Sequence, residues 1–98
     1  MNSSQQDILI SIKKIKDEVM RTYPVKNIGV FGSVARNEQT EASDIDLLVE
    51  FSQPVGFVTF IRLESFLSKR LGRPVDLVTS DSLKPVIRQD ILSEVIYV

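Results

Sequence analysis

Three aspartates and one Gly-Ser pair are the residues of this sequence whose types and spacing could do chemistry. Asp44 and Asp46 flank one apolar residue at the start of a predicted strand. The period of two along a strand places both carboxylates on one face, about 6–7 Å apart. Asp76 interrupts an apolar run at the start of a later predicted strand, where aspartate is uncommon and rarely buried without a partner. Gly32-Ser33 follows a strand and opens a predicted helical turn, a place where free N–H groups favour phosphate.

Each of these features has an ordinary structural explanation when it is taken alone. A Gly-Ser pair after a strand is commonly a turn with an N-cap, and two aspartates at a strand start can cap a loop and face water. The combination is more informative. If the strands that carry Asp46 and Asp76 are parallel neighbours, their N-terminal ends are adjacent, and an antiparallel first strand brings Gly32-Ser33 to the same edge. We therefore expect three carboxylates and a phosphate-type turn to share one site.

The predicted site offers only oxygen ligands, because the sequence contains no histidine and no cysteine. Carboxylates combined with substrate phosphates are the ligands that Mg²⁺ or Mn²⁺ prefers. Two such ions, about 3.5–4 Å apart, would clamp the attacking and leaving oxygens of an in-line displacement at phosphorus.

The elements that must position these residues follow from hydrophobic spacing and from Gly, Pro and Ser signals. A first helix, capped by Ser3 or Ser4, ends near Tyr23, and a short helical turn begins at Ser33. The remaining predicted elements are the strands 25–31, 45–51 and 74–79, the helix 57–71, and a last helix 83–94 capped by Ser82. A crossover helix makes the second and third strands parallel, whereas the short connection favours an antiparallel first pair. The expected fold is α/β (α+β), a small mixed three-stranded sheet with helices packed on it, in the order α-β-(short α)-β-α-β-α.

Composition narrows the class of protein. A chain of 98 residues fits one domain, 1–98, with one modest core. The formal charge of −1 argues against direct nucleic-acid binding, and the lack of cysteine excludes disulfides and thiol catalysis. Because no apolar run is long enough for a signal peptide or a membrane span, we expect a cytoplasmic protein without membrane contact.

The stretch GVFGSVARNEQTEASDIDLLVEF resembles the signature of the polymerase-beta-type nucleotidyltransferase superfamily, in which Gly-Ser, a spacer and Asp-x-Asp precede a third Asp on a later strand. Ten residues separate Ser33 from Asp44. This spacing, the Ala35-Arg36 pair and the later Val75-Asp76-Leu77-Val78 closely resemble minimal nucleotidyltransferase antitoxins (MNT or MntA-like). The similarity spans nearly the whole chain. One departure is Asn37, where such proteins often have glycine, although asparagine also tolerates a left-handed helix end.

The resemblance implies a palm-like catalytic domain that uses ATP with Mg²⁺ and transfers AMP to a tyrosine hydroxyl of a HEPN-domain ribonuclease toxin, its partner in a hetero-oligomer. Asp44 and Asp46 would then hold both metal ions. Asp76 would complete the catalytic metal site and help to take the proton from the incoming hydroxyl. Gly32-Ser33 would hold the β- and γ-phosphates. Arg36 would reach a phosphate or an acidic group of the toxin, or be a surface residue.

Two other functions remain open at this stage. The chain could neutralise a toxin by binding alone, with a vestigial or regulatory nucleotide site. It could also be a small-molecule nucleotidyltransferase, although a chain of this length has no acceptor-binding domain.

Overall fold

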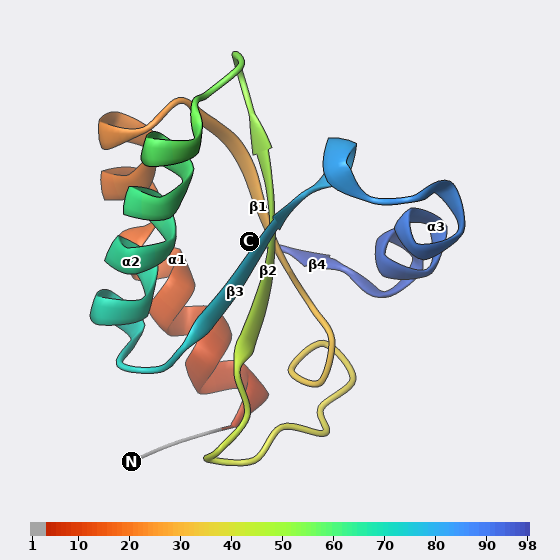
Figure 1. Cartoon of the computed structure of the whole chain (residues 1–98). Coiled ribbons are helices and arrows are strands. Elements are labelled where there is room, and N and C mark those ends of the chain that lie inside the picture. Colours follow the sequence, from red (N-terminus) through yellow and green to blue (C-terminus); the bar gives the residue numbers. More distant parts are fainter. Residues whose placement is uncertain (1–3) are drawn as a thin grey trace.

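The fold is a four-stranded mixed sheet that separates two helices on one side from a third helix on the other (Figure 1). The computed structural model describes residues 4–98. Its elements, in chain order, are α1 (Gln5–Thr22), β1 (Val25–Phe31), β2 (Ile45–Phe51), α2 (Phe57–Leu71), β3 (Val75–Thr79), the 3-10 turn η1 (Ser80–Ser82), α3 (Pro85–Glu94) and β4 (Ile96–Tyr97).

Helix α1 begins and ends where its sequence signals place it. Ser4 is the N-cap, and its hydroxyl oxygen accepts the backbone N–H of Asp7 at 3.1 Å. Of the two serines predicted as caps, Ser4 is therefore the one used, and Ser3 lies outside the described residues. The helix ends at Thr22 because Pro24 disfavours a helical conformation in the residue before it.

Helix α2 has the predicted bounds. Its apolar residues recur every four positions, so Leu63, Leu67 and Leu71 lie on one buried stripe. Gly72 ends the helix in the left-handed conformation, with φ 69°. This stripe packs with α1 and the sheet into the hydrophobic core.

The strand order is β3-β2-β1-β4, with β1–β2 antiparallel and β2–β3 parallel as predicted. The prediction of three strands was wrong. The C-terminal string forms a fourth strand, β4, which pairs antiparallel with β1 through Gly29–Tyr97 and Val30–Ile96. Only two residues pair, which is too short a run to show the alternation that identifies a strand in a sequence.

Four smaller predictions also need correction. The strand predicted over 74–79 begins at Val75, because Pro74 has no N–H to donate to a ladder. The last helix begins at Pro85 rather than residue 83, with Lys84 as the N-cap. Ser82 does not cap it, because its hydroxyl donates to Thr79 O at 2.9 Å within η1. The residues after Phe31 form one hydrogen-bonded turn rather than a short helix.

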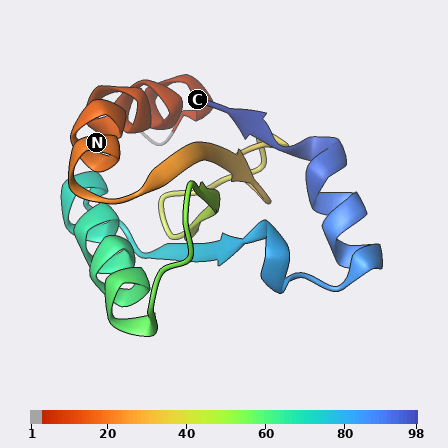
Figure 2. The same cartoon turned by 90° about the horizontal axis from the view of Figure 1, so that it is seen from above.

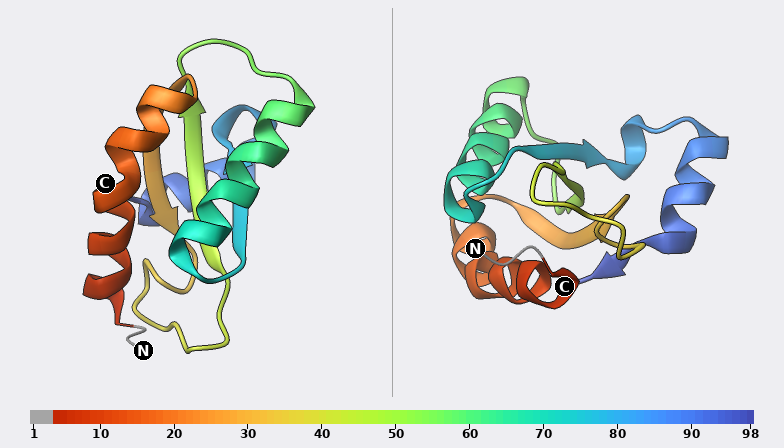
Figure 3. Two further views of the ribbon diagram at one scale, coloured as in Figure 1. Left: turned by 90° about the vertical axis from the view of Figure 1, so that its left-hand side faces the viewer. Right: turned by 90° about the horizontal axis from the view of Figure 1, so that it is seen from below.

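The two faces of the sheet differ in how helices cover them. Helices α1 and α2 cover one face, and Figure 2 and the left view of Figure 3 show them side by side against it. Helix α3 lies on the other side and has no buried residue among its ten described positions. Within residues 4–98, no helix has the length and apolar character needed to span a membrane. The face opposite α1 and α2, called here the open face, is where the acidic residues lie.

Candidate active site

Asp46 and Asp76 lie side by side on neighbouring strands. The parallel register of β2 and β3 pairs Asp46 with Asp76. Along β2, the residues on either side of Asp46 are buried in the helix-covered core, so the Asp46 side chain is on the open face. Asp46 is half-buried, whereas Asp76 and Asp44, the residue before β2, are exposed. The structure thus brings the second and third predicted aspartates together and places the first at the adjoining strand start.

Gly32 lies against the Asp46 carboxylate. The antiparallel register pairs Asp46 with Phe31, and the chain continues directly into Gly32. Gly32 has φ 74°, a conformation that side chains rarely adopt. A Cβ at this position would also overlap Oδ2 of Asp46. The glycine is required because the backbone turns and passes a carboxylate at the same point.

Hydrogen bonds within the turn after β1, and from a side chain of α1, hold the backbone of this turn. Arg36 N–H donates to Gly32 O at 3.1 Å, and Glu38 N–H donates to Ser33 O at 2.8 Å. Asn37 has φ 58°, which agrees with the expectation that asparagine takes the left-handed position there. The Gln5 side-chain amide of α1 donates to two carbonyl groups of the turn, at 2.9 and 3.1 Å. Ser33 is half-buried in this turn, and its carbonyl oxygen is one of the acceptors in these hydrogen bonds.

Glu94, the last residue of α3, reaches the same turn. Its Oε1 accepts the backbone N–H of Gly32 at 3.1 Å, and its Oε2 accepts Nη1 of Arg36 at 3.0 Å. Arg36 Nε also donates to Glu38 Oε1 at 2.9 Å, and these bonds to Glu38 and Glu94 raise the pKa of Arg36. Sequence reasoning missed Glu94, because it lies 62 positions from Gly32 and no spacing rule connects the two.

Asp46 is the electrostatic centre of the acidic group. Its pKa is raised above the ordinary value, first by burial and then by the negative charges of Asp76 and Asp44. Arg36 opposes this increase, and Glu94 adds to it. An increase caused by both neighbours means that the three aspartates share one region of negative potential. A cation would relieve that potential.

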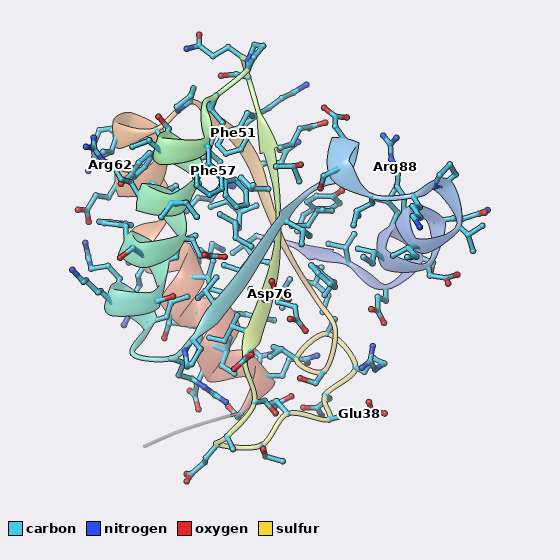
Figure 4. All side chains as sticks on the ribbon, in the orientation of Figure 1. Glu38, Phe51, Phe57, Arg62, Asp76 and Arg88 are labelled. Carbon is cyan, nitrogen blue, oxygen red and sulfur yellow. The ribbon has the colours of Figure 1, made fainter. Side chains whose placement is uncertain are left out.

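The donor set fits a hard divalent cation in its chemistry, since all its ligands are carboxylate oxygens. In the part of the chain that the structure describes, no group of three or more acidic side chains is arranged so that it could hold a metal ion as it stands. Figure 4 shows Asp76 on the open side of the sheet, towards the end that carries the loop with Glu38. The exposed side chains of Asp44 and Asp76 have room to turn towards a bound cation.

Residues 12–98 match the family model described as the nucleotidyltransferase domain. The chain belongs to this nucleotidyltransferase family. A Methanocaldococcus jannaschii protein, MJ0128, provisionally named a protein adenylyltransferase, is 50% identical over 97 residues, which cover 98% of this chain and 96% of the relative. The protein adenylyltransferase MntA of Thermococcus cleftensis is 46% identical over 83 residues, which cover 85% of this chain and 84% of the relative.

Solved structures agree with this assignment. One described provisionally as a minimal nucleotidyltransferase has a TM-score of 0.83 and 33% identity, and the match covers 97% of this chain and 96% of that one. The fold is also similar to a structure of a tri-AMPylated Shewanella oneidensis HEPN toxin in complex with MNT antitoxin. That match has a TM-score of 0.71 and 23% identity, and it covers 92% of this chain and 70% of the other. The prediction of a minimal nucleotidyltransferase enzyme is therefore confirmed.

Proposed function

We propose that this nucleotidyltransferase is an antitoxin that transfers AMP from ATP to a tyrosine hydroxyl of a HEPN-domain ribonuclease toxin and so silences it. The single observation that carries the proposal is the register that pairs Asp46 with Asp76 beside the Gly32 turn. The names of the two sequence relatives support transfer of AMP to a protein. The MNT–HEPN complex of similar fold supports the class of partner. Such an enzyme would act in the cytoplasm, where its partner is made.

We propose that Asp44, Asp46 and Asp76 hold Mg²⁺, with Mn²⁺ as the alternative ion. When bound, the metal would screen the charge of the phosphates and of the three carboxylates. Gly32 and Ser33 would bind the β- and γ-phosphates through the backbone N–H groups and the hydroxyl at the start of the turn. Arg36 would exchange its carboxylate partners for a phosphate or for an acidic group of the toxin.

The chemistry is an in-line displacement at the α-phosphorus of ATP. The tyrosine oxygen forms a bond to this phosphorus while the bond to the bridging oxygen breaks, and pyrophosphate leaves with the electron pair. The phenolic proton passes to the Asp76 carboxylate, which is exposed on the open face and therefore accessible to an incoming hydroxyl. Asp46 is less suited to this role, because it is half-buried against Gly32.

Transfer of label from α-³²P-ATP to the purified toxin tests the proposal. The matched variant is Asp76→Asn, which nearly preserves shape but removes one negative charge and the proton acceptor. We expect the parent protein to label the toxin, and Asp76→Asn to bind Mg²⁺–ATP but to lower the rate of labelling by about 100-fold or more.

Neutralisation of the toxin in cells separates catalysis from binding. If Asp76→Asn protects cells as well as the parent does and yet transfers no AMP, protection comes from complex formation. The protein would then be an antitoxin that acts by binding. Label that appears on a small molecule instead of on the toxin would favour a small-molecule nucleotidyltransferase.

A further inference from the structure

Glu94 accepts hydrogen bonds from two of the donors that the proposed phosphate site would offer. Its Oε1 accepts the Gly32 N–H at 3.1 Å, and Nη1 of Arg36 donates to Oε2 at 3.0 Å and to Oε1 at 3.3 Å. A carboxylate held by a backbone N–H and a guanidinium makes the same kind of charge-assisted hydrogen bonds as a phosphate. In this structure, a carboxylate of the chain itself therefore stands where phosphate oxygens would bind.

The short β1–β4 ladder determines where Glu94 lies. Val30 pairs antiparallel with Ile96, and two further residues along each chain set Glu94 opposite Gly32. Glu94 is also the last residue of α3, and the acceptor of the Gly32 N–H is its side chain. Figure 1 shows α3 and the loop after β1 on the side of the sheet opposite α1 and α2. The ladder thus holds the backbone near Glu94, and the carboxylate can leave Gly32 by rotation of the side chain alone.

Burial differs between Gly32 and the two charged side chains. Gly32 is buried, and a buried N–H without an acceptor is costly, so an acceptor is needed there with or without a nucleotide. The side chains of Glu94 and Arg36 are by contrast 27% and 49% exposed. An ion pair with this much exposure is weak. A triphosphate, which brings several oxygens and a higher charge, can therefore replace the carboxylate at both donors.

The charge of Glu94 acts in the same direction as its hydrogen bonds. Besides burial and the two neighbouring aspartates, Glu94 contributes to the raised pKa of Asp46, so its negative charge acts on the acidic group as well as on the turn. A nucleotide triphosphate brings negative charge into the same region. The carboxylate therefore opposes nucleotide binding in two ways, by occupying the donors and by repulsion.

We infer that Glu94 is an autoinhibitory side chain: its carboxylate occupies the phosphate position before a nucleotide binds, and it must turn away to admit the phosphates. The inference rests on the proposed function, which assigns Gly32 and Arg36 to the phosphates. It adds regulation to that site, because ATP binds by exchange of one acceptor for another. The apparent affinity for ATP is then the affinity of the open site multiplied by the fraction of molecules in which Glu94 has turned away.

Calorimetric titration of two Glu94 variants with Mg²⁺–ATP and with Mg²⁺–tripolyphosphate tests the inference. Glu94→Gln removes the charge, whereas Glu94→Asp keeps the charge but is one methylene too short to reach both donors at once. Both variants are expected to lower the Kd of both ligands by about three- to tenfold, because the contact lies at the phosphates. The direction of the change is informative, since a side chain that only braces the turn would weaken binding when it is changed.

Glu38→Gln is the matched control. It removes the same charge, and Glu38 also accepts a hydrogen bond from the Arg36 side chain, at 2.9 Å, but the acceptor of the Gly32 N–H is Glu94. The Kd values of this variant are expected to stay within roughly twofold of those of the parent. Amide NMR spectra of all three variants verify that each retains the native fold.

Three outcomes overturn the inference. Equal or weaker binding by both Glu94 variants would make Glu94 a brace of the turn. A gain in Glu94→Gln with no gain in Glu94→Asp would assign the effect to repulsion alone, and so would an equal gain in Glu38→Gln. In each of these cases the parent still binds both ligands, and the phosphate site of the proposed function stands. If the parent binds neither ligand, the proposed function itself is wrong, and the inference about Glu94 falls with it.

Discussion

Gly32 shows how one residue can satisfy two separate demands of this site. Its backbone has φ 74°, and its missing Cβ leaves room for Oδ2 of Asp46. Gly72 has nearly the same conformation, with φ 69°, but nothing lies within 4 Å of a Cβ there. Comparing Gly32 with Gly72 therefore separates two contributions to the free energy of unfolding: the strain of a side chain in the left-handed conformation, and the overlap of a Cβ with the Asp46 carboxylate.

Alanine substitution at these two glycines is expected to give unequal losses of stability. Gly72→Ala should lower the free energy of unfolding by about 1–2 kcal/mol, the cost of a left-handed alanine. Gly32→Ala should lower it by roughly a further 1–3 kcal/mol, because the methyl group must displace Asp46 in a packed turn. Urea unfolding measures both values. Equal losses would mean that the contact with Asp46 places no constraint on the turn.

The raised pKa of Asp46 predicts how stability depends on pH. The native state prefers the protonated carboxyl, so the associated stabilisation is complete below the unfolded-state value of 3.8 and is lost as the pH rises through the native pKa. At pH 7 the ionised Asp46 therefore opposes folding of the metal-free protein. We expect Asp46→Asn to have a higher free energy of unfolding than the parent at pH 7, and the difference to shrink towards pH 3. Urea titrations across this pH range test it, and a variant that is less stable at every pH would contradict the assignment.

At the scale of the elements, Glu94 ties the end of α3 to the turn that follows β1. Glu94→Ala removes the acceptor of the Gly32 N–H and is expected to speed hydrogen exchange of that amide by about tenfold or more. Glu38→Ala is the matched control, because Glu38 also accepts a hydrogen bond from the Arg36 side chain, but the acceptor of the Gly32 N–H is Glu94. Amide exchange followed by NMR distinguishes the two variants. If the Gly32 amide exchanged equally fast in both variants, Glu94 would hold the turn through its bond to the Arg36 side chain and not through its bond to the Gly32 N–H.

The elements also show which features a sequence can predict. Helix α2 was predicted with its observed bounds, because a four-residue apolar repeat and Gly72 are local signals. The pairing of Asp46 with Asp76 followed from one inference, that a crossover helix makes β2 and β3 parallel. Strand β4 was not predicted, because it exists only through its pairing with β1. Glu94 was not predicted either, because its role depends on where α3 ends relative to the turn.

In the molecule as a whole, one face of the sheet packs into the hydrophobic core, and the opposite face carries the residues of the candidate active site. The face beneath α1 and α2 contains the hydrophobic core, whereas the open face carries Asp46 and Asp76. A bound ligand would therefore act on the open face, where the carboxylates repel one another, and not on the hydrophobic core. A cation with a nucleotide would replace repulsion between carboxylates by attraction.

The proposed site predicts that Mg²⁺ and ATP together stabilise the whole fold. A ligand at about 100 times its Kd adds about 2.7 kcal/mol to the free energy of unfolding. In a domain of this size, that gain corresponds to a rise in Tm of about 10–20 °C. Thermal melts with ATP plus Mg²⁺ and with ATP plus a chelator measure the effect. Equal Tm values under the two conditions would contradict a metal site at the aspartates.

Asp46→Asn gives this last experiment its sharpest control, because its two expected effects on Tm have opposite signs. Without ligand at pH 7, the variant should melt at a higher temperature than the parent, since the negative charge of the half-buried Asp46, next to two other aspartates, has been removed. With Mg²⁺ and ATP, it should lose most of the ligand-induced rise, since a metal ligand has been removed as well. Asp81→Asn, in η1, changes an exposed aspartate outside the acidic group and should keep the full rise. A full rise in Asp46→Asn would place the metal and the nucleotide away from the paired strands β2 and β3.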